Sequence, residues 1–294
     1  MGYRLPLATS VAIFLLLIAG SLVVGLKAGL ACPDWPLCNG KVIPPLEGKV
    51  LVEYVHRLLS FLVSLMMLWN GIVAWRKRKS SPVPARLTFF SLFLLFAVAG
   101  LGAINVILKL PPGFTAIDVG VANLLFGTYV WITTLCYYKK KDLGEVKGKR
   151  ALIKAGLAAT LVVYFQLVLG AFVEHSRAGL IAIQEQYRLL NFLVPSPAVA
   201  KTWMNTHLIV TYGVVAMCLW VIFLGKSKNV FKKQRRLLAL LLGFQMMVGF
   251  LTIYSQLAVY STVLHMALAS LMFGVCIWIT VQAWVETHSK KSLY

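Results

Sequence analysis

Long apolar segments recur along the whole chain of 294 residues and constrain its fold more than any other feature. A helix needs ~20 predominantly apolar residues to cross the hydrocarbon core of a bilayer. Here 60% of the residues are hydrophobic and only 13% are charged, whereas a soluble domain of this length carries far more polar surface. We therefore expect an all-α polytopic membrane protein with eight transmembrane helices. The segments cover residues 7–29, 51–75, 87–108, 114–137, 151–173, 203–225, 237–254 and 261–284.

The net charge of +20 predicts the orientation of these helices. Most of the Lys and Arg residues cluster in alternate connections, which by the positive-inside rule face the cytoplasm together with both termini. We expect an inner (cell) membrane location and no nucleic-acid partner, because the basic loops are short and divided between helix pairs. The basic connections are residues 76–86, 139–150 and 225–236.

Two cysteines, Cys32 and Cys38, share the first connection on the expected outer side, "ACPDWPLCNG". In an oxidising compartment such a pair favours a disulfide that closes a small loop. A pair of free thiols or a metal site are the alternatives, and no histidine lies nearby in the sequence to complete a metal site.

An internal repeat divides the chain into two halves. Residues 20–31, "GSLVVGLKAGLA", align with residues 170–181, "GAFVEHSRAGLI", and residues 118–132 align without a gap with residues 265–279. The repeat unit holds four helices, so both halves have the same orientation, related by a pseudo-twofold axis along the membrane normal. We expect two tandem four-helix bundles. The predicted halves are residues 1–145 and 146–294.

Four ionisable residues occupy repeat-equivalent positions near the outer helix ends. His56 corresponds to His207, and Asp118 corresponds to His265. A single histidine in a membrane helix is often only a hydrogen-bonding residue between helices, but two at one depth suit the axial ligands of a haem. His207 and His265 are the candidate pair. A divalent metal is the rival, although two histidines do not fill a tetrahedral zinc shell.

The first half contains the sequence "EYVHR", which places Glu53, His56 and Arg57 close together on one helix. One interpretation is a Glu53–Arg57 ion pair at the membrane interface. The other is a reactive site, in which His56 binds an iron or a porphyrin substrate and Glu53 handles protons. Asp118 at the same depth favours the second interpretation. Candidates for pairing with haem propionates, or for simple interfacial snorkelling, are Lys27, Arg57 and Arg177.

These residues together resemble the haem A synthase family over essentially the whole chain. The resemblance rests on the eight helices in two halves, the "CPDWPLCNG" and "EYVHR" sequences, and the histidines near the outer ends of the sixth and eighth segments. It implies oxidation of a ring methyl of haem O to a formyl group, which gives haem A for terminal oxidase assembly. It also implies a prosthetic haem B on His207 and His265. In the first half it implies substrate haem O, with His56 as a ligand and Glu53 as the catalytic residue.

The resemblance also places the pair Cys32 and Cys38 above the first-half site, with a role in turnover or stability. It implies as partners a haem O synthase (a farnesyltransferase) and an electron donor or acceptor, and it leaves self-association open. One residue departs from the family pattern, because Asp118 stands where a fourth ligand histidine is expected. Asp118 could bind iron weakly, leave it five-coordinate, or hold a water. We expect the second half to transfer electrons and the first to be catalytic.

A b-type membrane cytochrome, linked to quinones and without haem modification, is the alternative function. It explains His207 and His265 equally well. It gives no reason for Glu53 beside His56, or for the acid Asp118 in the first half.

Overall fold

The computed structural model describes residues 1–139, 149–184 and 196–287, and within these ranges it contains nine helices and no β-strand. Eight of the helices are long and apolar enough to cross a membrane, so the chain is a multi-pass membrane protein. The exception is α6, which has seven residues. The helices are α1 (Arg4–Gly25), α2 (Gly48–Lys77), α3 (Pro82–Ile107), α4 (Pro112–Tyr138), α5 (Lys149–His175), α6 (Ala178–Gln184), α7 (Pro197–Ser227), α8 (Lys232–Tyr254) and α9 (Val259–Thr287).

Each of the eight predicted segments corresponds to one long helix, which confirms the predicted all-α fold. Most helices extend a few residues beyond the predicted boundaries, by as much as six residues at the start of α7. The predicted segment 7–29 is too long, because α1 ends at Gly25 and Lys27 turns into the left-handed region with φ 53°. The segment 237–254 starts too late, because charged residues from Lys232 onward already belong to α8. The short α6 was not predicted, since seven residues leave no long apolar run.

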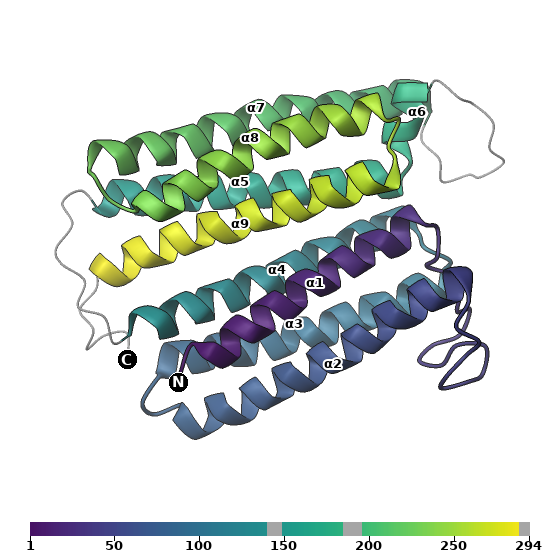
Figure 1. The fold of residues 1–294 in the computed structure, drawn as a ribbon, viewed down its shortest axis with the longest axis horizontal. Coiled ribbons are helices and arrows are strands. Elements are labelled where there is room, and N and C mark those ends of the chain that lie inside the picture. Colours follow the sequence, from purple (N-terminus) through teal and green to yellow (C-terminus); the bar gives the residue numbers. More distant parts are fainter. Residues whose placement is uncertain (140–148, 185–195, 288–294) are drawn as a thin grey trace.

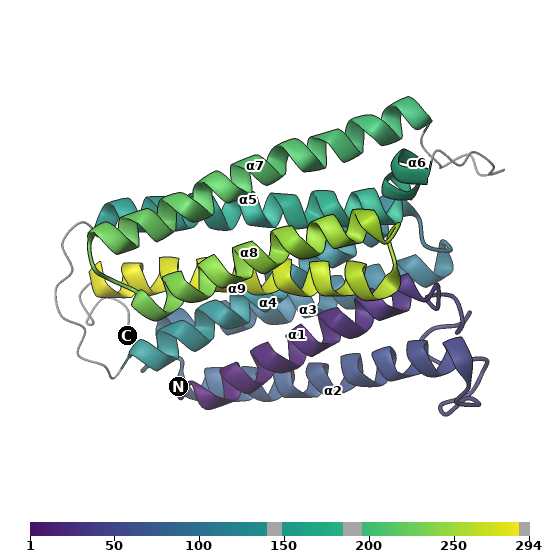
Figure 2. The same ribbon diagram turned by 45° about the horizontal axis from the view of Figure 1, so that its top comes forward.

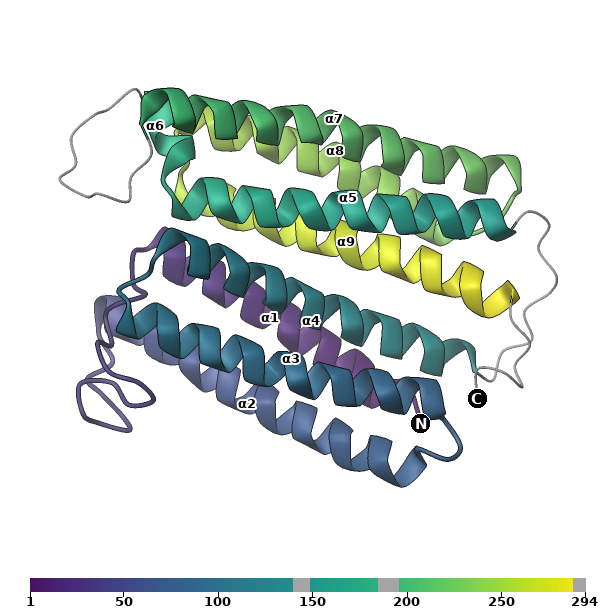
Figure 3. The same ribbon diagram turned by 180° about the vertical axis from the view of Figure 1, so that it is seen from behind.

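The long helices form two rings of four (Figures 1 and 3). In the first ring α1 contacts α2, α2 contacts α3, α3 contacts α4, and α4 contacts α1. The second ring follows the same order with α5, α7, α8 and α9. Only helix packing of this kind satisfies every backbone group in a bilayer without a closed barrel. Within each ring, the second and fourth helices are diagonally opposite.

Equivalent aromatic pairs hold the first helix of each ring to the fourth. The ring centroids of Phe14 in α1 and Phe126 in α4 are 5.8 Å apart. Tyr164 in α5 and Phe273 in α9 occupy the corresponding positions, with centroids 5.5 Å apart. The two bundles therefore repeat their packing as well as their helix order.

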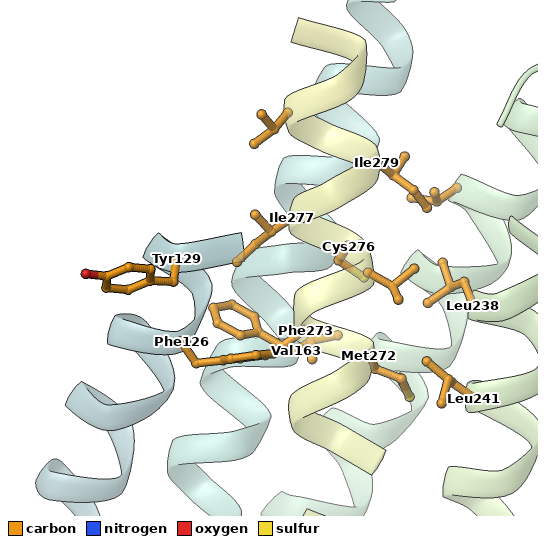
Figure 4. Packing of buried hydrophobic residues seen from close by; sticks show 14 of the residues in the cluster. Phe126, Tyr129, Val163, Leu238, Leu241, Met272, Phe273, Cys276, Ile277 and Ile279 are labelled. Atoms are coloured by element: carbon orange, nitrogen blue, oxygen red, sulfur yellow. The ribbon is translucent and has the colours of Figure 1, made fainter. Parts of the chain in front are cut away.

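The interface between the rings has the reciprocal contacts of a twofold arrangement. It is formed by α4 against α9, with α1 against α9 and α4 against α5 on either side. A methyl group at Gly127 would lie 2.7 Å from Phe273, and one at Gly274 would lie 3.1 Å from Phe126. Each phenylalanine thus packs onto the glycine of the other helix, and Figure 4 shows both phenyl groups between α4 and α9. Such exchange of contacts is what an isologous interface requires.

A hydrogen bond joins the two helices at equivalent positions. The Ser270 hydroxyl donates to Asn123 Oδ1 over 2.8 Å, and both side chains are fully buried. These residues occupy the same place in the two repeats, so the pseudo-twofold axis passes close to this pair. The predicted domain boundary between residues 145 and 146, with most of the basic connection 139–150, lies outside the described residues and stays a prediction.

The helix ends also repeat. Lys27 after α1 and Arg177 after α5 have left-handed φ values of 53° and 59°, and Lys109 after α3 and Gln256 after α8 have 57° and 53°. Helices often end with a left-handed residue, but glycine normally takes that position. These four ends lie with residues 26–47 and α6 at one end of the molecule, called here the disulfide end (Figure 2). The N-terminus lies at the other end.

Candidate functional site

The candidate ligands line one large cavity toward the disulfide end. Its volume is about 2220 Å³, and residues of both rings form its walls. That volume exceeds the ~300–1,000 Å³ of a pocket for one drug-sized ligand, so it offers room for more than one bulky group. All four repeat-equivalent ionisable residues of the sequence prediction line it, namely His56, Asp118, His207 and His265.

In the second ring, His207 and His265 lie on diagonally opposite helices, α7 and α9. Each imidazole packs against a glycine of a neighbouring helix. A methyl group at Gly170 in α5 would lie 3.0 Å from His207 Cε1, and one at Gly249 in α8 would lie 3.2 Å from His265 Cε1. Because these glycines have no side chain, they leave space for the two imidazole groups.

A glutamine amide lies beside the Nε2 atom of each histidine. Gln166 Nε2 lies 3.3 Å from His207 Nε2, and Gln245 Nε2 lies 3.3 Å from His265 Nε2. Both Nδ1 atoms are buried without a hydrogen-bond partner among the described residues. Two histidines on diagonally opposite helices that line one large cavity are the donor set of a bis-histidine haem, so the residues of the second ring fit that group.

The first ring repeats half of this arrangement. His56 in α2 packs on Gly20 in α1, where a methyl group would lie 3.3 Å from His56 Cε1. The other position differs, because Asp118 in α4 accepts a hydrogen bond of 3.1 Å from Asn105 Nδ2 in α3. Gly102, the repeat equivalent of Gly249, has no atom within 4 Å of an added methyl group. The first ring therefore offers one histidine and an open side.

Glu53 is buried, with 5% of its surface exposed, and pairs with Arg57 through a 2.9 Å contact between Arg57 Nε and Glu53 Oε1. The ion pair considered in the sequence analysis is therefore present. It does not exclude a reactive role, because Glu53 Oε2 is buried without a partner among the described residues and Glu53 lines the same cavity as His56.

The remaining donors of Arg57 bind the loop that carries the cysteines. Arg57 Nη1 donates to the carbonyl oxygens of Asp34 and Leu37 over 2.6 Å each, and Nη2 donates to that of Cys32 over 2.9 Å. The guanidinium is thus engaged by the loop and by Glu53. Arg57 therefore connects the loop to Glu53, and its pairing with a haem propionate stays a prediction.

Cys32 and Cys38 form the predicted disulfide, with Cα atoms 4.6 Å apart. The enclosed loop is shaped by Asp34, whose carboxylate accepts backbone N–H bonds of 2.8 Å from Gly40 and 2.6 Å from Asn39. The Gly40 bond is the main cause that lowers the pKa of Asp34 below its usual value; desolvation opposes it, and the Asn39 bond adds a smaller lowering. The loop is therefore closed both covalently and by hydrogen bonds.

Four residues of the site were not predicted from the sequence: Asn105, Gln166, Gln245 and the glycine position 102. A signal for two of them exists in the repeat. Residues 166–170, "QLVLG", and 245–249, "QMMVG", share the pattern Gln-x-x-x-Gly on the helix before each second-half histidine. In the first half, the equivalent pattern keeps the glycine and replaces each glutamine with an apolar residue.

Comparisons with known proteins agree with this geometry. Residues 46–277 match the sequence model of the COX15-CtaA family, described as "Cytochrome oxidase assembly protein". The chain is 26% identical to "Heme A synthase" of Lysinibacillus sphaericus (strain C3-41), over 97% of this chain and 95% of that protein. It is 24% identical to "Heme A synthase" of Bacillus cereus (strain G9842), over 98% and 95%. For "Heme A synthase" of Bacillus mycoides (strain KBAB4) the identity is 25%, over 98% and 94%.

The family match spans most of the chain, from just before α2 into α9, and includes Glu53 and the four repeat-equivalent residues that line the cavity. The resemblance found in the sequence motifs is confirmed. The chain belongs to the COX15-CtaA family of cytochrome oxidase assembly proteins.

Proposed function

We propose that the protein is a haem A synthase, which oxidises a ring methyl of haem O to the formyl group of haem A. The observation that carries this proposal is the difference between the two rings. The second ring has two histidines on diagonally opposite helices, whereas the first has one histidine beside a buried carboxylate. The relatives named "Heme A synthase" match nearly the whole chain, which supports the same activity.

In the second ring, His207 and His265 would hold haem B as a prosthetic group. A haem with two strong axial ligands has no open coordination position, and its chemistry is one-electron transfer. Gly170 and Gly249 hold the imidazoles in place from behind. This ring therefore stores or passes the electrons that leave the substrate.

In the first ring, His56 would bind the iron of the substrate haem O. Where water supplies the formyl oxygen, conversion of a methyl to a formyl group releases protons as well as electrons, so the site needs a base that is shielded from bulk water. Glu53 is one helical turn from His56, and its Oε2 is buried without a partner among the described residues. Glu53 would accept these protons, while Arg57 fixes its other oxygen.

The domains follow from this assignment. Residues 1–145 form the substrate half and residues 146–294 the prosthetic half, in the inner (cell) membrane with both termini in the cytoplasm and the Cys32–Cys38 loop outside. A haem O synthase (farnesyltransferase) would supply the substrate, and an electron donor or acceptor would exchange with the second half. A homo-oligomer is compatible with these roles and is not needed for them.

The test is to express the full chain in cells that make haem O, purify it, extract the bound haems and separate them by chromatography. Haem A, or haem O hydroxylated at the methyl, is the expected product. Recovery of haem B alone, from cells shown to contain haem O, would instead indicate the quinone-linked b-type cytochrome. That alternative is not favoured, because it leaves the buried Glu53 beside His56 without a function.

A further inference from the structure

The first ring has a free space where the second ring has an imidazole. In the second ring, the His265 ring fills the space in front of Gly249, at 3.2 Å from an added methyl group. In the first ring, Asp118 replaces that histidine, and nothing lies within 4 Å of a methyl group added at Gly102. Both Gly102 and Asp118 line the cavity. The shorter side chain therefore leaves room at this position for a small molecule.

Two residues that line the same cavity as Gly102 have unpaired oxygen atoms. Asn105 is one turn along α3 from Gly102, only 5% of its surface is exposed, and its Nδ2 binds Asp118 Oδ2. Asn105 Oδ1 and Asp118 Oδ1 are both buried, and neither has a hydrogen-bond partner among the described residues. In the second ring the equivalent of Asn105 is Thr252, whose hydroxyl is satisfied by the Val248 carbonyl at 2.8 Å. At this position the second ring thus has no unpaired oxygen among the described residues; its own unpaired oxygens are those of Gln166 and Gln245, beside the histidines.

The chemistry of these atoms defines the occupant. A carboxylate oxygen and an amide oxygen both accept hydrogen bonds, so the occupant must donate two. An unpaired buried acceptor costs ~1–3 kcal/mol, which a donor in this space would remove. Water has two O–H groups, it needs two or more polar partners in a buried site, and it is small enough for the volume of a lost imidazole. Dioxygen and carbon monoxide cannot donate and do not fit this pair.

We propose that Asp118 and Asn105 bind a water molecule at the position of the missing imidazole, between Asp118 and the face of the first-ring haem. The inference rests on the proposed function, because it requires a haem on His56. The two side-chain oxygens would hold the water by its hydrogens, which leaves its oxygen free to bind the iron of a haem held by His56. Asp118 is a positioning residue for this water and does not bind the iron itself. The first-ring haem thereby keeps one exchangeable side, while the second-ring haem has none.

The test uses the purified full chain with haem in both halves, in the ferric state. Electron paramagnetic resonance should show a high-spin signal from the first ring beside the low-spin signal of the second. Transfer into oxygen-17-labelled water should broaden the high-spin signal, since the labelled oxygen is bound to iron. A high-spin signal that does not broaden would mean that Asp118 binds the iron directly or that the position is empty, and would overturn the proposal.

Two reciprocal variants exchange the side chains at the equivalent positions 118 and 265. Asp118→His should convert the first ring to a low-spin site and weaken cyanide binding there by about 100-fold or more, because cyanide must displace a strong ligand. His265→Asp should remove the low-spin signal of the second ring. Asp118→Asn keeps the shape and removes the charge, so the high-spin signal should remain and cyanide, an anion, should bind about tenfold tighter. Unchanged cyanide affinity in Asp118→His would contradict the proposal.

The outcomes separate this proposal from the proposed function. Two haems per chain that are both low-spin, with no cyanide binding in the unchanged protein, would overturn the water site and leave the synthase assignment intact. A single haem that is lost in His207→Ala and unaffected by His56→Ala would show that the first ring binds no haem, and would overturn both proposals. The labelled-water measurement needs no variant, so it tests the proposal even if Asp118→His does not fold.

Discussion

The two halves of this protein share a backbone plan and differ in a few side chains that face the cavity. Both are rings of four helices, with left-handed residues at equivalent ends and a glycine facing three of the four ligand positions at close contact. The second half adds a glutamine behind each histidine. The first half adds Glu53, which Arg57 connects to the disulfide loop, and the hydrogen-bonded pair Asn105 and Asp118. The comparison shows that a binding space is set by helix packing, whereas its chemistry is set by single residues within that space.

The difference also concerns how strongly each half holds its ligand. Two imidazoles that pack on glycines and face each other across a bundle close both sides of a haem. One imidazole opposite a carboxylate leaves a side open, as a substrate that must enter and leave requires. We therefore expect the second half to bind its haem permanently and the first half to exchange its haem. The following measurements test this difference.

The largest effect is expected from His207→Ala. Loss of one axial ligand should lower haem B retention in the second half by about 100-fold or more, and the low-spin signal should disappear from the purified protein. His175→Ala is the matched control, because His175 lines the same cavity without a repeat-equivalent histidine. Full retention of low-spin haem B in His207→Ala would show that His207 is not a ligand of that haem.

Glu53→Gln should reduce haem A formation by about 100-fold, the usual contribution of a general acid or base. Bound haem B should stay unchanged, because Glu53 belongs to the first half. Glu47→Gln, at the exposed start of α2, is the control and should keep full activity. Haem chromatography measures both quantities, and equal loss of haem A and haem B in Glu53→Gln would indicate a structural role instead.

A third comparison concerns the glycines. Gly170→Ala should lower the affinity of the second half for haem by about tenfold, since the new methyl would lie 3.0 Å from His207 and displace a ligand. Gly102→Ala should leave that haem and the folding of the protein unchanged, because nothing lies within 4 Å. Titration of haem into the purified variants tests both. Equal effects of the two changes would mean that the halves do not differ in packing at these positions.

Arg57→Gln should loosen the disulfide loop, because it loses bonds to three loop carbonyls. We expect reduction of Cys32–Cys38 by dithiothreitol to become several-fold faster, on the order of one or two hydrogen bonds from a charged donor. Arg57→Lys should restore only part of the protection, because lysine lacks the planar set of donors. Unchanged reduction kinetics in Arg57→Gln would show that the disulfide alone holds the loop.

The smallest effect concerns Asp34. Its pKa is lowered by the Gly40 and Asn39 N–H groups, so the folded loop favours the ionised form. This contribution is fully present above the unfolded pKa of about 3.9 and is lost as the pH falls through the lower folded value. Hydrogen exchange at the Asn39 and Gly40 amides should therefore gain an acid-induced opening below about pH 4 that Asp34→Asn lacks. An identical pH profile in that variant would contradict the role of Asp34.

Much of the fold follows from the sequence, because lipid leaves few choices to an apolar segment of ~20 residues. The repeat then placed His56, Asp118, His207 and His265 at related positions, and they line one cavity. The hydrogen-bonded pairs between helices could not be predicted in the same way. The periodicity of one helix says which of its faces is apolar, but not which residue of a neighbour stands opposite.

The contacts of Arg57 escaped prediction for a related reason. Its partners are backbone carbonyls of the loop, and these have no side-chain identity that a sequence could reveal. The aligned repeat segments, residues 20–31 and 118–132, do not include α3, so they do not single out Asn105. An alignment of α3 with α8 pairs Gly102 with Gly249, and then places Asn105 against Thr252 within the same turn.

The reciprocal packing of Phe126 on Gly274 and Phe273 on Gly127 has a consequence for how such a protein can change. An isologous contact of this kind is the one that two copies of a single four-helix chain would form, so the protein resembles a dimer whose subunits are joined covalently. In a dimer of identical chains, replacing a histidine by an acid alters both sites together. Once the subunits are fused, one position can become Asp118 while its twin stays His265, and a cofactor carrier and a reaction chamber can arise from the same ancestral unit.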